Sequence, residues 1–103
     1  MNAELCLNMG TLLMQINRQI DAIVYLKKAL QINPNDPGSP YSLASIFSSQ
    51  EQLEDGYTYL EMALKNGISF FDMLQVDVTL SSLRKNTTRW KALMKQYFPK
   101  KIK

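Results

Sequence analysis

Residues 3–36 read AELCLNMGTLLMQINRQIDAIVYLKKALQINPND, and residues 37–70 read PGSPYSLASIFSSQEQLEDGYTYLEMALKNGISF. When Ala3 is aligned with Pro37, the two segments carry apolar or small residues at the same offsets. These positions are Met9, Gly10, Leu13, Ala22, Leu26, Ala29 and Pro34 in the first segment, and Leu43, Ala44, Phe47, Gly56, Leu60, Ala63 and Ile68 in the second. A period of this length is typical of stacked helix pairs, in which small residues stand where two helices cross closely.

The first segment predicts a helical hairpin. Apolar residues recur at steps of three and four over residues 3–16, which indicates an amphipathic helix. A second helix is predicted over residues 19–32, and Asn17 between them tolerates the left-handed conformation that a tight turn needs. Pro34 is expected to end the second helix, because proline cannot continue a helical hydrogen-bond ladder.

The second segment predicts another hairpin, and its start has two alternatives. Asp36 can cap a helix that has Pro37 in its first position, or Ser39 can cap a helix that begins at Pro40. Pro40 favours the later start, because deeper in a helix it would forfeit a backbone hydrogen bond.

The second helix of this hairpin is predicted from about Leu53 to Lys65, with Asn66 and Gly67 as its C-terminal cap. Gly56 stands where the first segment has Ala22. It should loosen this helix by up to roughly 1 kcal/mol relative to alanine.

Beyond residue 67 the repeat is lost. The apolar residues from 68 to 83 are interrupted, which predicts two short helical turns in place of one long helix. Thr87 or Thr88 is then expected to cap a last helix that runs to about Phe98, where Pro99 ends it.

These residues resemble the tetratricopeptide repeat family. The resemblance extends from residue 3 to about residue 70, and it depends on Ala22 and Ala29, with Gly10 before them and Pro34 after. It implies an all-α fold of two antiparallel helix-pair repeats in a right-handed superhelical array, followed by short helical turns and a C-terminal capping helix.

A single domain over residues 1–103 is expected, because a chain of this length and 46% hydrophobic content can bury one core and is too short for two. Its parts would be a first repeat at 3–36, a second repeat at 37–70, a C-terminal cap at 71–98 and a basic tail at 99–103. The cap also resembles a terminal element that follows bacterial repeats of this family. The matching residues are Gly67, Leu74, Asp77, Leu80, Leu83, Arg84, Trp90 and Leu93.

In this family the concave groove is lined mainly by the first helix of each repeat. By position, the resemblance implies a groove formed by Glu4, Leu7, Asn8, Thr11, Gln15, Tyr41, Ser42, Ser45, Ser48 and Ser49. Such a lining suits an extended or helical peptide held by side-chain hydrogen bonds, with Tyr41 as an aromatic anchor. A plain solvated face is the alternative. Leu7, Thr11 and Ser42 stand where chaperone-binding members grip a terminal carboxylate, so a carboxylate clamp is not expected.

Charge is divided unequally along the chain, whose net charge is +3. Residues 1–77 hold all nine acidic side chains and four basic ones, a net charge of −5, whereas residues 78–103 hold eight basic side chains and no acidic one. The basic residues are Arg84, Lys85, Arg89, Lys91, Lys95, Lys100, Lys101 and Lys103. They could contact nucleic acid, an anionic membrane or an acidic protein. A solvated helix face is favoured over these three kinds of ligand. A further alternative is that the basic residues pair with the acidic body, residues 1–77 of the same chain.

The sequence lacks most of the residues that usually support catalysis or metal binding. The chain has no histidine and one cysteine, and Cys6 lies in an apolar helical stripe, where a packed core residue is favoured over a reactive thiol. The sequence therefore predicts no enzyme and no cofactor. No apolar run approaches the roughly 20 residues that cross a bilayer, and a cytoplasmic compartment is the default expectation.

One apolar surface is expected to lack a neighbour. Leu5, Met9, Leu12 and Ile16 on the first helix have no preceding helix to pack on. Either further repeats precede Met1 in the natural chain, or two copies form a homodimer through this helix pair. Since an array usually needs about three repeats, the C-terminal part of a longer protein is favoured.

The sequence as a whole predicts a protein–protein interaction scaffold that binds a peptide or helix through its concave groove. The alternative function is a basic C-terminal module that docks on nucleic acid or anionic membrane.

Overall fold

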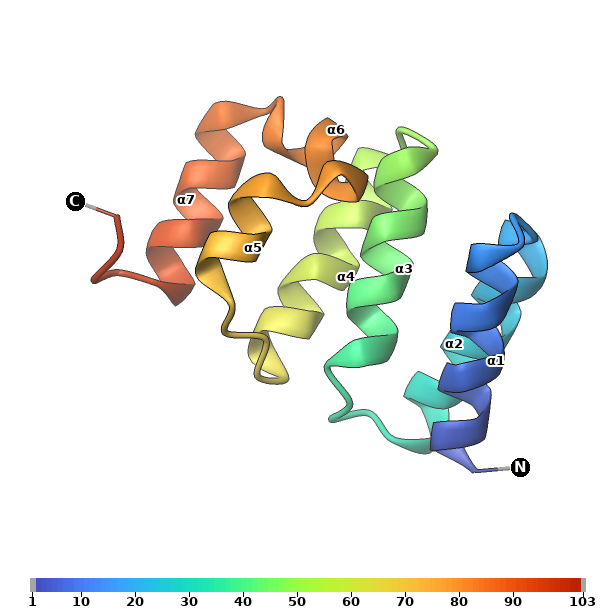
Figure 1. Cartoon of the computed structure of the whole chain (residues 1–103). Helices are drawn as coiled ribbons and strands as arrows, with labels where there is room; N and C mark the ends of the chain where they lie inside the picture. The colour runs from blue at the N-terminus through green and yellow to red at the C-terminus, as the bar shows by residue number, and fades with distance from the viewer. Residues whose placement is uncertain (1, 103) are drawn as a thin grey trace.

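The apolar periodicity of the sequence is realised as a series of helices, and no strand occurs in residues 2–102, which are the residues that the computed structural model describes (Figure 1). In chain order the helices are α1 (Ala3–Gln15), α2 (Gln19–Ile32), α3 (Gly38–Ser49), α4 (Leu53–Lys65), α5 (Phe71–Val76), the 3-10 helix η1 (Val78–Leu80), α6 (Ser81–Arg84) and α7 (Thr87–Tyr97). The all-α fold class expected from the sequence is confirmed. None of the helices in this part of the chain is long and apolar enough to cross a membrane.

Two helical hairpins, α1 with α2 and α3 with α4, turn in the same way. Asn17 and Glu51, which stand at equivalent places in the two aligned segments, both adopt the left-handed conformation, with φ of 62° and 58°. The residue after each donates its backbone N–H to a carbonyl five residues back at 2.8 Å, Arg18 to Leu13 and Gln52 to Phe47. The turn predicted at Asn17 is confirmed. Glutamate at the second turn carries a steric cost that asparagine largely avoids.

Close crossing of α1 and α2 depends on Gly10. A Cβ atom at this position would lie 2.7 Å from the Leu26 side chain, which is fully buried. Leu26 and Ala22 share a core cluster with Leu43 and Phe47 of α3. The first hairpin is therefore joined to the second through a continuous apolar core.

The start of α3 follows the earlier of the two predicted alternatives, so the expected start at Pro40 is wrong. The helix begins at Gly38, and the Asp36 carboxylate accepts hydrogen bonds from the backbone nitrogens of Gly38 at 3.1 Å and Ser39 at 3.0 Å. Pro40 has no N–H to give to the carbonyl of Asp36. The side-chain amide of Asn66 donates to that carbonyl instead, at 3.0 Å.

The C-terminal region differs from the sequence prediction in two details. Three short helices, α5, η1 and α6, replace the two expected turns. The cap of α7 is Asn86, whose side chain accepts a hydrogen bond from the backbone nitrogen of Arg89 at 3.3 Å, and not Thr87 or Thr88. Asparagine is as good a helix cap as threonine, so the local sequence did not discriminate between them.

Leu83 of α6 anchors this region on α4. A Cβ atom at Gly56 would lie 2.9 Å from the Leu83 side chain, and the Tyr57 hydroxyl donates to the Leu83 carbonyl at 2.5 Å. Leu83 belongs to a core cluster that also holds Trp90 and Met94 of α7. Gly56 is therefore a site of close packing between α4 and α6. From the sequence alone, this glycine indicated only a lower helix propensity.

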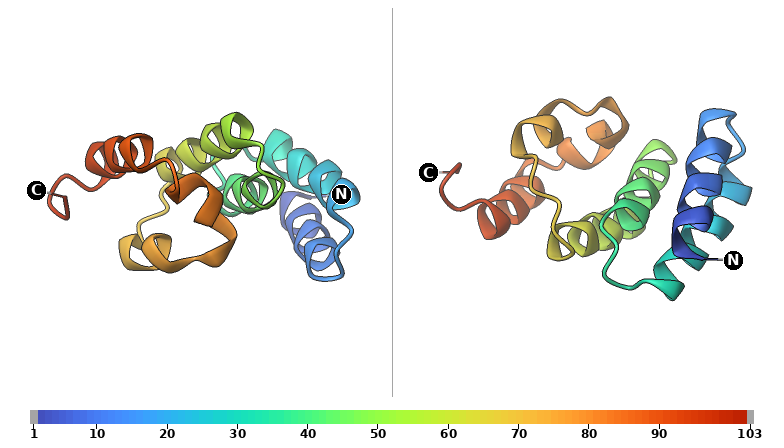
Figure 2. Two further views of the ribbon diagram at one scale, coloured as in Figure 1. Left: turned by 90° about the horizontal axis from the view of Figure 1, so that it is seen from above. Right: turned by 60° about the horizontal axis from the view of Figure 1, so that its bottom comes forward.

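The helices lie in two rows. Seen from above (Figure 2, left), α1, α3 and the segment from α5 to α6 lie on one side of the molecule, whereas α2, α4 and α7 lie on the other. The N-terminal and C-terminal ends lie at opposite ends of the molecule (Figure 1). The predicted groove residues all lie on α1 and α3, in the first of these rows.

Candidate functional site

The α1 part of the predicted groove faces solvent. Glu4, Asn8, Thr11 and Gln15 are exposed, and they follow one another at steps of three and four, so they share one face of the helix. Leu7, on the same face, is half-buried. The hydroxyl of Thr11 donates to the Leu7 carbonyl at 2.9 Å, which leaves the amides of Asn8 and Gln15 as the free donors of this face.

Tyr41 of α3 is engaged by its own chain. Its hydroxyl donates to the carboxylate of Asp77, and its ring makes an edge-to-face contact with Phe70 at 5.5 Å between centroids. Burial raises the pKa of Tyr41 well above its ordinary value, and the hydrogen bond with Asp77 raises it further. Tyr41 is therefore a neutral donor already paired with a carboxylate, and in this structure it does not present a free aromatic anchor.

The serines of α3 correct the predicted groove further. Ser45 and Ser48 are buried, and Ser42 is half-buried. The Ser45 hydroxyl donates to the Tyr41 carbonyl at 3.2 Å, and its oxygen lies 3.1 Å from that of the Thr79 hydroxyl. Ser45 is covered by Thr79 of η1, and Ser48 is buried, so in this structure neither hydroxyl of the predicted groove faces solvent.

Ser49 is the exposed member of the set. It donates its hydroxyl to the Ser45 carbonyl at 2.9 Å, one turn back in the same helix. Its oxygen can still accept a hydrogen bond, but its donor is already used.

Four side chains join α3 to η1, and we refer to Tyr41, Ser45, Asp77 and Thr79 as the cap latch. Asp77 accepts from the Thr79 backbone nitrogen at 2.9 Å and from the Thr79 hydroxyl at 2.7 Å. Burial alone would raise the pKa of Asp77, but the hydrogen bonds from Tyr41 and Thr79 outweigh it and hold the pKa below its usual range. Asp77 was visible in the sequence as part of the terminal pattern, whereas its partner Tyr41, 36 residues earlier, carried no local signal.

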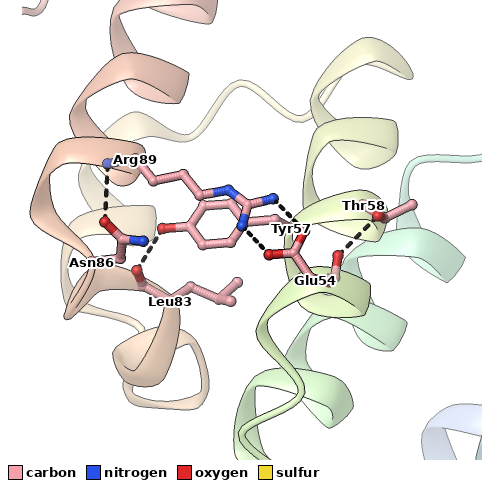
Figure 3. Close-up of polar contacts among 6 residues, drawn as sticks. All are labelled: Glu54, Tyr57, Thr58, Leu83, Asn86 and Arg89. Carbon is pink, nitrogen blue, oxygen red and sulfur yellow. Dashed lines mark hydrogen bonds and ion pairs between the residues drawn. The ribbon is translucent and has the colours of Figure 1, made fainter.

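Arg89, one of the predicted basic patch residues, packs back onto α4 (Figure 3). Its guanidinium lies 4.2 Å from the centroid of the Tyr57 ring and donates to both carboxylate oxygens of Glu54, at 2.6 and 3.2 Å. The hydrogen bond from Arg89 lowers the pKa of Glu54. This residue supports the alternative that the basic region pairs with the acidic body.

Arg84 is also engaged within the chain. Its Nη1 atom donates to the Leu74 carbonyl at 2.9 Å, and its guanidinium lies 5.8 Å from the Trp90 ring centroid. The remaining described members of the basic patch are exposed, and these are Lys85, Lys91, Lys95, Lys100 and Lys101. Lys103 lies outside the described residues.

Metal ligation has no visible basis in residues 2–102. No three side chains of histidine, cysteine, aspartate or glutamate gather there in an arrangement that could hold an ion. Cys6 of α1 is fully buried.

Comparison with known proteins identifies the first hairpin. A family model described as the tetratricopeptide repeat matches residues 3–36, which are α1, α2 and the turn that follows them. No curated protein and no solved structure matches the chain. The matched segment is the one in which Gly10 allows α1 and α2 to cross closely, with Ala22 and Ala29 fully buried, and residues 3–36 are therefore identified as a tetratricopeptide repeat.

Proposed function

We propose that the chain binds a peptide or a helix of a partner protein on the face formed by α1 and the exposed part of α3. A tetratricopeptide repeat indicates a protein–protein interaction module rather than a catalyst. The observation that carries the proposal is the row of exposed polar side chains on α1, at Glu4, Asn8, Thr11 and Gln15.

The chemistry of this face defines the kind of ligand. The amides of Asn8 and Gln15 each offer both donors and acceptors, and can pair with the backbone of an extended segment. Glu4 is the one charged residue of α1. An acidic terminus would meet no basic partner on this helix, so a neutral or basic segment suits the face better.

The extent of the scaffold is part of the proposal. Residues 37–70 would form a second repeat, because the α3–α4 turn has the geometry of the α1–α2 turn at the equivalent place in the aligned segment. Residues 71–98 would form its cap, since Leu83 fills the space that Gly56 leaves on α4. The groove would then be open over α1 and closed by η1 over the middle of α3.

Selection from a displayed peptide library against the 103-residue chain tests the proposal. A selected peptide should bind the unaltered chain, and the double variant Asn8→Ala with Gln15→Ala should weaken binding at least about tenfold, since two hydrogen-bonding amides are lost. The matched control is Lys27→Ala with Gln31→Ala, two exposed positions on α2 in the opposite row. Equal affinity for all three proteins would exclude α1 as the binding face.

The alternative function is docking of the basic C-terminal region on nucleic acid or anionic lipid, and it predicts a different response to salt and to mutation. Arg84 and Arg89 already make internal contacts, so the lysines of α7 and the tail would carry any docking on nucleic acid or anionic lipid. Binding of that kind should fall steeply with added salt and weaken on replacement of Lys91 and Lys95 by glutamine. Groove binding should change little under either treatment.

A further inference from the structure

One face of α1 is apolar and uncovered within the described residues, and we call Leu5, Met9, Leu12 and Ile16 the apolar stripe. Their exposed fractions are 55%, 39%, 52% and 56%. With about 3.6 residues per helical turn, the four side chains lie within one narrow sector of the helix. Leu7 and Met14, on the opposite side, pack against the core cluster shared with α3, so the stripe faces away from the rest of the molecule.

The spacing of the stripe is its most informative property. The steps from Leu5 to Ile16 are four, three and four residues, which is the spacing of a coiled-coil seam. This order is the same in both directions along the chain. Two copies of α1 laid antiparallel would therefore place Leu5 opposite Ile16 of the other copy and Met9 opposite Leu12, around a two-fold axis between Met9 and Leu12.

The face of α3 that corresponds to the apolar stripe is buried against other helices of this chain. Met9 and Leu12 correspond, when the two segments are aligned, to Leu43 and Ile46. Those two side chains are 0% and 1% exposed, in the cluster that contains Leu26 of α2. A surface of this composition is thus buried against another helix where one is present.

Charge favours the antiparallel arrangement. Glu4 stands at one end of the stripe, and α1 itself carries no basic residue. Arg18 follows the other end, and in the antiparallel arrangement it would lie next to Glu4 of the second copy. Its present partner Asp21 forms an exposed ion pair, which is worth little and is easily exchanged.

We infer that a second copy of this chain covers the apolar stripe, and that α1 pairs with α1 in an antiparallel, two-fold symmetric dimer. Four half-exposed side chains per copy provide less area than the roughly 800 Å² per partner of a standard stable interface. The dimer is therefore weak, with a dissociation constant on the order of 100 µM. The stripe adjoins the polar face of α1, and Glu4 belongs to both surfaces. The inference does not rest on the proposed peptide binding, because the pairing uses the apolar side chains of the stripe.

Sedimentation equilibrium of the 103-residue chain measures the association directly. The mean molar mass should rise from that of a monomer at about 5 µM to nearly that of a dimer at about 1 mM. Met9→Glu and Leu12→Glu, each of which places a carboxylate beside the two-fold axis, should keep the protein monomeric at the higher concentration. Val24→Glu is the matched control, because Val24 is 53% exposed on α2 and outside the stripe, and it should associate like the unaltered chain.

A mixing experiment tests the pairing itself. Leu12→Lys should also be monomeric alone, but an equimolar mixture of Met9→Glu and Leu12→Lys chains should form a heterodimer, because the two introduced charges face each other across the axis. Circular dichroism of each variant serves as the folding control. A monomer at about 1 mM, or association that Met9→Glu leaves intact, would overturn the inference, as would a mixture of folded variants that stays monomeric.

Discussion

Ser45 and Ser48 of α3 are chemically identical and both buried, yet their hydroxyls have different surroundings. Ser45 is bonded to Tyr41 and Thr79, whereas the hydroxyl of Ser48 has no hydrogen-bond partner among the described residues. A buried polar group that is satisfied stabilises a fold modestly, whereas one without a partner carries the cost of its desolvation. The two positions therefore respond to alanine in opposite directions.

Replacement of each serine by alanine checks this contrast. Ser48→Ala is expected to raise the free energy of unfolding by up to about 1 kcal/mol, because it removes an unpaired hydroxyl. Ser45→Ala is expected to lower it by about 1 kcal/mol, because the hydroxyl that contacts the Tyr41 carbonyl and Thr79 is lost. Urea unfolding followed by circular dichroism gives both values, and equal shifts for the two variants would contradict the assignment.

Gly56→Ala is a second case in which the neighbours of a residue decide the outcome. Helix propensity alone predicts a gain of up to about 1 kcal/mol. The added methyl group would lie 2.9 Å from the side chain of Leu83, which is fully buried, so overpacking at a cost of about 1–3 kcal/mol should exceed that gain. Net destabilisation is expected in thermal unfolding.

A double-mutant cycle isolates the contact between these two residues. In the background of Leu83→Ala the crowding is gone, so the same change at Gly56 should now stabilise the protein. If Gly56→Ala destabilised both backgrounds equally, close packing against Leu83 would not be the reason for the glycine.

At the scale of elements, the attachment of η1 to α3 is sensitive to acid. The pKa of Asp77 in the folded protein lies below its usual range, because the hydrogen bonds from Tyr41 and Thr79 outweigh the effect of burial. A carboxylate with a depressed folded pKa contributes stability that is complete above its unfolded pKa of about 3.9 and is lost as the pH falls through the folded value. The cap latch should therefore weaken below about pH 4.

Asp77→Asn tests this dependence. The variant should be less stable than the unaltered chain at neutral pH, and the difference should shrink as the pH falls below about 4, where Asp77 becomes protonated. Asp72→Asn changes an exposed position on α5 and makes the same change in net charge. Its difference in stability from the unaltered chain should stay constant as the pH falls. Free energies of unfolding measured between about pH 3 and pH 7 compare the three proteins.

Helix boundaries were largely predictable, but contacts between elements were not. The sequence predicted α2 and α4 with the bounds that the structure has, since apolar periodicity and turn residues are local signals. The burial of Ser45 was missed, because it depends on Thr79, which lies far along the chain in a different helix. The polar face of α1 was predictable for the opposite reason, as nothing in the described chain packs over Asn8 or Gln15.

At the scale of the whole molecule, the acidic body and the basic C-terminal region meet at Glu54 and Arg89. The carboxylate side chain of Glu54 is 83% exposed, so the ion pair itself adds little stability. Arg89 also covers the Tyr57 ring, and this contact between α7 and α4 does not depend on the carboxylate.

Variants of the pair separate these two contributions. Arg89→Ala should lower the melting temperature more than Glu54→Gln does, because it removes the stacked guanidinium as well as the charge. Melting temperatures measured at low and high salt provide the comparison. A larger effect from Glu54→Gln would show that the ion pair dominates this junction.

Asn66, whose side-chain amide donates to the carbonyls of Pro34 and Asp36 at 2.9 and 3.0 Å, is followed by glycine. Asparagine before glycine deamidates readily, because the unhindered glycine nitrogen can attack the side-chain carbonyl carbon. In the folded chain the amide is held by two acceptors, and the Gly67 N–H is bonded to Leu64, so folding slows this reaction. Each unfolding event exposes the pair, and the carboxylate that forms would repel the two carbonyl oxygens that the amide once joined. The chemical ageing of the chain at Asn66 is thereby linked to its folding equilibrium.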